Sequence, residues 1–213
     1  TMRHVMVMTA TASVGLIAIF IVDMLNLFYI SLLGVQELAA AVGFASTLMF
    51  FTLSVSIGLT IPTAALVGRT LGQNNRPAAA AMGGISMVYM GLISTATALA
   101  IWPFVTPLLE LLGARGETLR LAARFLDIVI PSTPIMGLAM GSTGILRGAG
   151  DARRSMYVTL AGGVATAILD PILIFGLDLG LDGAAISTVL SRFVMLAFGL
   201  YGARQVHQML AMP

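Results

Sequence analysis

The chain has 213 residues, of which 58% are hydrophobic and 9% are charged, and its formal net charge is +2. A soluble domain carries roughly 25% charged residues, so this composition excludes a soluble domain with a polar surface. The excess of basic residues indicates membrane topology rather than nucleic-acid binding. The absence of cysteine excludes disulfides, thiolate metal sites and cysteine nucleophiles.

Long uncharged runs, bounded by glycine, proline and charge clusters, fill most of the chain. A bilayer core of about 30 Å is crossed by about 20 mostly apolar residues in a helix, and six of these runs reach that length. We therefore predict an all-α integral membrane protein, with residues 1–213 forming a single six-helix transmembrane domain. The predicted spans are 8–33, 38–67, 82–109, 121–146, 155–177 and 184–203.

The arginines alternate between the two sets of connections that these spans create. One set holds Arg3, Arg69, Arg76, Arg147, Arg153, Arg154 and Arg204, and the other holds Arg115, Arg120 and Arg124. Positively charged connections remain in the cytoplasm. The sequence therefore predicts a multi-pass protein of the cell inner membrane with both termini cytoplasmic.

Asp23 is the only ionisable residue deep inside the first predicted span. At 1.5 Å per residue it lies about 16 Å from the turn that follows, close to mid-membrane, where an ionised carboxylate is costly. Asn26, three residues on, shares its helix face. We interpret both as ion-coupling residues, because a carboxyl group kept from water can hold a proton and release it when a cation arrives. The alternative is that Asp23 only joins helices.

Four residues along the fourth span recur at helical spacing and form one face. They are Thr133, Met136, Met140 and Thr143. Methionine side chains adapt to bulky apolar ligands, so we predict that this face lines a substrate cavity. Ordinary helix packing is the alternative. Pro131 and Pro134 should bend the outer half of this helix.

Asp170 in the fifth span and Arg192 in the sixth lie at the same depth as Asp23, about 15 and 13 Å from the outer turn. Thr166 lies one turn before Asp170, and Pro171 should loosen the helix beside it. We assign Asp170 and Thr166 to ion coupling. Arg192 is the candidate for a structural ion pair, with Asp170 as one partner.

The two histidines, His4 and His207, lie near opposite ends of the chain and predict no metal site. Na⁺ is the metal ion that Asp23 and Asp170 could hold. No phosphate-binding loop of the GxxxxGK type is present, so nothing supports transport driven by ATP hydrolysis in this chain.

Other classes of membrane protein remain as alternatives. The segment Gly148-Ala149-Gly150-Asp151 imitates an element of intramembrane aspartyl proteases, with Asp23 as a conceivable second carboxylate. However, two arginines follow it at the predicted membrane surface, where an enclosed pair of carboxyl groups cannot form. A channel or a structural membrane subunit is the other alternative.

Three motifs carry a family resemblance that extends over nearly the whole chain. They are LVGRTLG at 66–72, LRGAGD at 146–151 and ILDPILIFG at 168–176. Together they resemble the multidrug and toxic compound extrusion (MATE) family, and in particular its DNA-damage-inducible protein F (DinF) branch. The sequence departs from the resemblance at Thr143 and Thr166, where family members often carry asparagine.

The resemblance implies a transporter of twelve helices in two six-helix lobes, of which this chain looks like the amino-terminal lobe. It implies export of organic cationic or amphiphilic compounds in exchange for H⁺ or Na⁺, without a cofactor and without enzymatic activity. By the same resemblance, Asp23 matches the family's coupling aspartate in the first helix, and Asp170 matches the aspartate that joins it. The implied partners are the lipid bilayer, a small-molecule substrate, and either the missing second lobe or a second copy in a homodimer.

Overall fold

The computed structural model of the chain describes residues 2–206 and 208–210, so His207 lies outside the described residues. The described part is helical throughout, with short connections. In order, the helices are α1 (Met2–Ser31), α2 (Gln36–Gly72), α3 (Arg76–Ile101), η1 (Trp102–Phe104), α4 (Val105–Leu111), α5 (Gly116–Val129), η2 (Ile130–Ser132), α6 (Thr133–Gly148), α7 (Ala152–Pro171), η3 (Ile172–Gly176), α8 (Leu181–Leu200) and η4 (Tyr201–Val206).

Six helical stretches in this part of the chain are long and apolar enough to cross a membrane. Four of them include an irregular helical segment: α3 continues through η1 into α4, α5 through η2 into α6, α7 into η3, and α8 into η4. The predicted all-α, six-helix membrane architecture is therefore confirmed.

Proline lies at several of the places where these helices lose regular geometry. The turn η2 is a single 3₁₀ turn that contains Pro131, and Pro134 occupies the first turn of α6. Pro171 ends α7, and the chain continues as the π-helix η3. A proline ring removes one backbone donor and pushes against the preceding turn, so the irregularities expected at these prolines are present.

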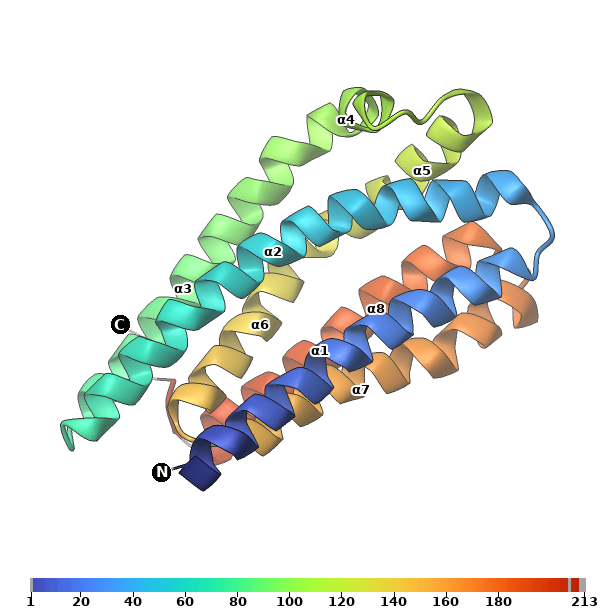
Figure 1. Cartoon of the computed structure of the whole chain (residues 1–213). Helices are drawn as coiled ribbons and strands as arrows, with labels where there is room; N and C mark the ends of the chain where they lie inside the picture. Colours follow the sequence, from blue (N-terminus) through green and yellow to red (C-terminus); the bar gives the residue numbers. More distant parts are fainter. Residues whose placement is uncertain (1, 207, 211–213) are drawn as a thin grey trace.

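The helices form two groups (Figure 1). In one, α1 packs on α7 and α7 on α8; in the other, α2 packs on α3 and both pack on α6. Contacts of α6 and α5 with α8 join the groups, whereas α1 and α2 make few contacts with each other although they are consecutive. The consequence is a space between α1 and α2 that is closed from behind by α6, α7 and α8.

Two motif glycines let α2 and α6 approach closely at one end of the bundle. A Cβ on Gly68 would lie 3.3 Å from the carbonyl oxygen of Gly148, and a Cβ on Gly148 would lie 2.7 Å from the carbonyl oxygen of Ala64. Any side chain at Gly148 would therefore push the helices apart. This contact gives the glycines of two sequence motifs a structural role.

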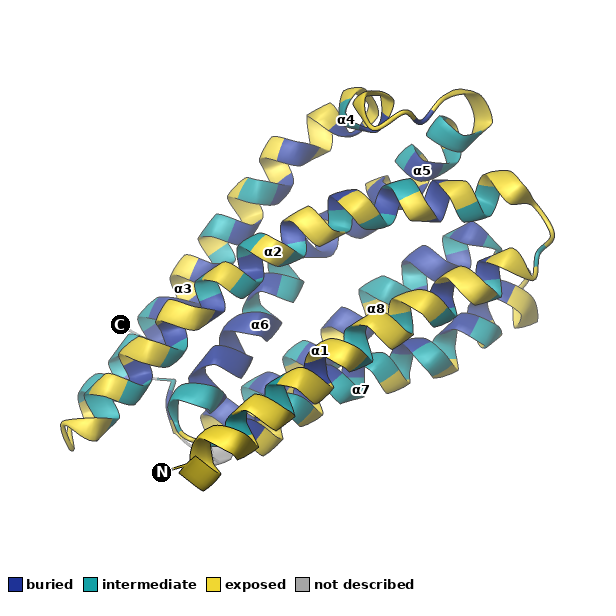
Figure 2. Ribbon diagram, viewed as in Figure 1, coloured by how far each residue is buried: buried dark blue, intermediate teal, exposed yellow. Residues whose placement is uncertain are grey.

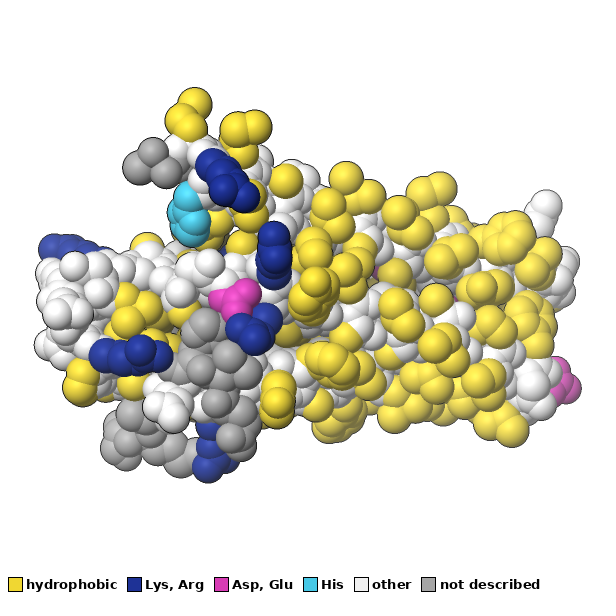
Figure 3. Space-filling model, turned by 90° about the horizontal axis from the view of Figure 1, so that it is seen from below, with side chains coloured by type: hydrophobic (Ala, Val, Ile, Leu, Met, Phe, Trp, Pro, Cys, Tyr) yellow, Lys and Arg dark blue, Asp and Glu magenta, His cyan; other side chains and the backbone are white. Residues whose placement is uncertain are grey.

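The surface fits a bilayer environment. Exposed residues run along the outward faces of α1, α2 and α3, and many are large and hydrophobic (Figure 2). Figure 3 shows basic side chains gathered toward one end of the molecule and a broad hydrophobic surface over the rest of the face shown. Both chain ends and the α2–α3 and α6–α7 turns lie toward that same end of the bundle (Figure 1).

Candidate functional site

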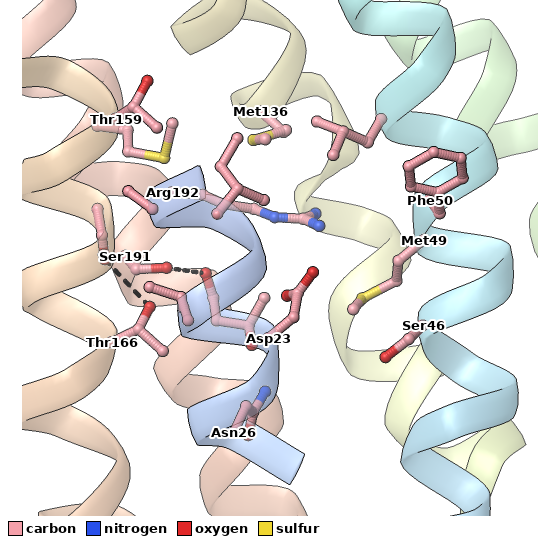
Figure 4. A pocket seen from close by; sticks show the side chains of 18 of the residues that line it. Asp23, Asn26, Ser46, Met49, Phe50, Met136, Thr159, Thr166, Ser191 and Arg192 are labelled. Carbon is pink, nitrogen blue, oxygen red and sulfur yellow. Dashed lines mark hydrogen bonds between the residues drawn. The ribbon is translucent and has the colours of Figure 1, made fainter. Parts of the chain in front are cut away.

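A pocket with a volume of about 120 Å³ lies inside the bundle, between α1, α2, α6, α7 and α8. Its lining includes six of the residues singled out from the sequence: Asp23, Asn26, Thr133, Met136, Thr166 and Arg192. Figure 4 shows the Asp23 carboxyl group and the Arg192 guanidinium directed into the same space, with Met49 and Met136 at its edge. The described lining therefore contains one acidic and one basic side chain.

Asp23 lies on the α1 wall of this pocket and is exposed in this chain, not buried as the sequence argument expected. The reason is the packing of α1, which turns its other face to α7 and leaves the Asp23 face open toward α2. Asp23 interacts electrostatically with Arg192, but the two side chains form no ion pair within 4 Å in the described structure. Its carboxyl group faces the pocket and remains available to a ligand or an ion.

Asp170, in contrast, is fully buried near the end of α7 and is not part of the pocket lining. Neither of its carboxyl oxygens has a hydrogen-bond partner in the described structure, although the Ser187 side chain lies close to it. The Oγ of Ser187 and the Oδ1 of Asn26 are also buried without partners. Burying a carboxylate without a hydrogen-bond partner is costly, and a proton or a cation bound to it would lower that cost.

Arg192 does not form the expected ion pair with Asp170. Its Nη1 donates hydrogen bonds to Ser132 Oγ at 2.7 Å and to the Val129 carbonyl oxygen at 3.3 Å, both at the junction of α5 and α6. The side chain extends from α8 into the pocket, and its hydrogen bonds reach this junction. Arg192 therefore links α8 to the bend in the fourth membrane crossing.

The predicted substrate face on α6 divides into two parts. Thr133 and Met136 line the pocket, whereas Met140 lines a second cavity of about 320 Å³ that also includes Arg147. Thr143 is fully buried and donates to the Met140 carbonyl oxygen at 2.7 Å. Met140 lies one helical turn after Met136. In this part of the chain α6 packs against α2, and Thr143 is buried.

Sequence reasoning missed the contribution of α2 to the pocket. Ser46, Met49, Phe50 and Leu53 line it opposite Asp23. The corresponding run contains no intramembrane charge, so no signal in the sequence distinguished this stretch from an ordinary lipid-facing helix.

Comparisons with known proteins identify the family. The family model described as MatE matches residues 11–172. The chain belongs to the MatE family. Among curated relatives, this MatE chain is 31% identical over 203 residues to a protein named FAD transporter from Shewanella oneidensis and 30% identical over 190 residues to the multidrug export protein MepA from Staphylococcus aureus. These matches cover 92% and 87% of the chain but 44% and 41% of the relatives, so the chain spans less than half of their length.

Solved structures agree with this assignment. The MATE transporter VcmN from Vibrio cholerae, crystallised in a bent form, superposes with a TM-score of 0.90 at 26% identity, covering 98% of this chain and 47% of that one. A second structure, titled as MATE in the bent conformation, gives a TM-score of 0.91 at 24% identity over 99% of this chain and 47% of its own. The fold is thus that of one MATE lobe; the DinF branch stays a prediction.

The protease alternative gains no support, because the family match is to MatE and the relatives are named as transporters. Asp151 instead begins α7: its Oδ1 accepts a hydrogen bond from the Arg154 backbone N–H at 3.0 Å, and its carboxylate pairs with the Arg154 side chain. A side chain that caps a helix at the end of the molecule explains the GAGD motif without catalysis.

Proposed function

We propose that this MatE chain forms one lobe of a secondary transporter that exports organic cationic or amphiphilic compounds in exchange for H⁺ or Na⁺. The observation that carries the proposal is the pocket inside the six-helix bundle, where Asp23 is the single carboxylate among the lining residues. A carboxylate on the wall of a membrane-embedded pocket attracts a proton, Na⁺ or an organic cation in turn, which is the requirement for exchange.

Asp170 fits a second role in the same exchange. Its carboxyl group is fully buried and without a partner, so we infer that it takes up a proton or Na⁺ during part of the transport cycle. Asn26 and Thr166 line the pocket with side-chain oxygens, each on one of the two helices that carry the aspartates. They are suited to coordinate a small cation, because Na⁺ prefers oxygen ligands as other hard cations do.

The size of the pocket limits what this chain binds alone. A volume of about 120 Å³ suits an ion with a few waters or the charged end of a ligand, whereas drug-sized ligands occupy about 300–1,000 Å³. We therefore propose that a second six-helix lobe, or a second copy of this chain, completes the substrate cavity. The half-length coverage of the solved MATE structures supports this arrangement. The mass of the detergent-solubilised particle tests it, and a strictly single-lobe particle that still transports would contradict it.

We also propose that both termini are cytoplasmic in the cell inner membrane, because the turns that carry most of the arginines lie at the same end as the termini. The chain contains no cysteine, so single cysteines can report sidedness without background. A cysteine at Gln73 should react with impermeant reagents only from the cytoplasmic side, and one at Leu112 only from the outside.

Efflux from vesicles tests the proposed function. Protein reconstituted into liposomes should move a cationic dye against its concentration gradient when either a pH gradient or a Na⁺ gradient is imposed separately, with saturation at high dye concentration. The gradient that drives movement identifies the coupling ion. Movement that neither gradient affects would contradict ion exchange, and continuous, unsaturable conduction would identify a channel instead.

A further inference from the structure

We propose that Arg192 receives an anionic group of the exported compound, so that the preferred substrates are amphiphiles with a carboxylate, sulfonate or phosphate beside their cationic or apolar part. The proposal rests on the transport function proposed above and specifies its substrate class. It assigns to Arg192 a role in specificity beyond the structural one expected from the sequence.

The guanidinium of Arg192 has hydrogen-bonding capacity that the protein does not use. Both of its hydrogen bonds leave from Nη1, to Ser132 and to the Val129 carbonyl oxygen. Nε and Nη2 make no hydrogen bond in the described structure, yet neither belongs to the polar atoms that are fully buried without a partner. The side chain as a whole is 8% exposed, and it lines the pocket into which Figure 4 shows it directed.

The helix junction holds this guanidinium in place for a ligand. Ser132 and Val129 fix one nitrogen at the bend between α5 and α6, which leaves the remaining donors in a defined orientation. A planar guanidinium can bind the two oxygens of a carboxylate or phosphate through parallel N–H groups, and a positioned one loses little freedom on doing so. The geometry thus matches an oxyanion better than an ammonium or an apolar group.

Charge balance in the pocket points in the same direction. Asp23 and Arg192 are the only charged side chains among the described lining residues. Arg192 interacts electrostatically with the Asp23 carboxylate across the pocket. When a cationic group of a ligand binds to Asp23, that carboxylate no longer compensates the charge of Arg192. An uncompensated charge is costly in a membrane interior, and an anionic group on the same ligand removes that cost.

A pair of dyes tests this inference. Rhodamine 110 carries a free carboxylate, and rhodamine 123 is its methyl ester, so the two share one cationic fluorophore and differ by the anionic group. Binding to the purified protein and gradient-driven movement in liposomes are measured for both dyes. The variants are Arg192→Gln and Arg192→Lys, with Arg153→Gln as a control that removes an exposed arginine far from the pocket lining.

The wild type should bind rhodamine 110 more tightly than rhodamine 123. Arg192→Gln should weaken binding of rhodamine 110 about tenfold, the effect of one lost charge-assisted hydrogen bond, and leave rhodamine 123 unchanged or bound more tightly. Arg192→Lys should recover part of the preference, since it keeps the charge without the planar donor pair. Arg153→Gln should keep the wild-type preference.

Ser132→Ala separates the charge of Arg192 from its packing. This variant removes the 2.7 Å hydrogen bond but keeps the guanidinium and its bond to the Val129 carbonyl oxygen, so the preference for rhodamine 110 should be reduced and not lost. If Ser132→Ala loses the preference as fully as Arg192→Gln does, the role of Arg192 is structural and the inference is overturned.

The remaining outcomes distinguish the inference from the function on which it rests. Equal transport of both dyes, equally affected by Arg192→Gln, would overturn the anionic-group inference and leave ion-coupled transport intact. Failure of the wild type to bind or move either dye would overturn the proposed transport of amphiphilic dyes and the inference together.

Discussion

Gly148 offers a direct test of the helix packing that shapes the site. In Gly148→Ala, the new Cβ would lie 2.7 Å from the Ala64 carbonyl oxygen and 2.8 Å from Val67 Cβ, whereas ordinary contact begins at 3.4 Å. The α2–α6 contact must therefore open by about 0.7 Å, the difference between 3.4 and 2.7 Å, and the nearest obstacle is backbone that cannot rotate away. Overpacking of this kind costs about 1–3 kcal/mol, which lowers the melting temperature by about 2–12 °C for a chain of this size.

Thermal unfolding of the purified protein in detergent measures this effect through Trp102, the only tryptophan of the chain. Gly43→Ala is the matched control, because nothing lies within 4 Å of a Cβ at Gly43 and the substitution is also glycine to alanine inside a helix. Both variants gain the helix propensity of alanine over glycine, so the difference between their melting temperatures reports the steric clash. Equal melting temperatures of Gly148→Ala and Gly43→Ala would show that no steric clash arises at Gly148.

Further predictions concern three carboxylates with different surroundings. Asp151→Ala should cost about 1 kcal/mol in the same melting assay, because it removes the cap on the Arg154 N–H, while Asp151→Asn should cost less since an amide oxygen still accepts that bond. Asp170→Asn should abolish any rise in melting temperature that Na⁺ or acidification gives the wild type, because the buried carboxyl that binds the ion is gone; an undiminished rise would exclude Asp170 as the ion site. Asp127→Ala should shift the emission of Trp102, whose Nε1 donates to Asp127 Oδ1 at 3.1 Å, without changing transport; loss of transport would contradict the peripheral role of this exposed contact.

The six-helix architecture could be predicted because the bilayer fixes the length of an apolar helix and makes charge inside it costly. Proline positions located the irregular turns η2 and η3 for a similarly local reason. Depth arithmetic along the helices placed Asp23, Asp170 and Arg192 in one layer, because rise per residue does not depend on neighbouring helices, and two of the three, Asp23 and Arg192, line one pocket.

The rest depends on which face each helix turns to its neighbours, and the sequence does not specify this. Asp170 lies only one turn from Thr166, yet Thr166 lines the pocket, whereas Asp170 is fully buried and does not line it. Met140 lies one turn from Met136 but faces a different cavity. Asp23 is exposed because α1 packs on α7 rather than α2, a pairing that arises from tertiary contacts between helices distant in the chain.

We propose that the Asp23 carboxyl group exchanges the coupling ion for the exported compound. Gradient-driven accumulation of a cationic dye is measured in liposomes that contain either the wild type or Asp23→Asn, with Asp127→Ala as the control. We expect that wild type and control accumulate the dye, while Asp23→Asn allows it only to equilibrate. Accumulation by Asp23→Asn at the wild-type rate and extent would exclude exchange at Asp23.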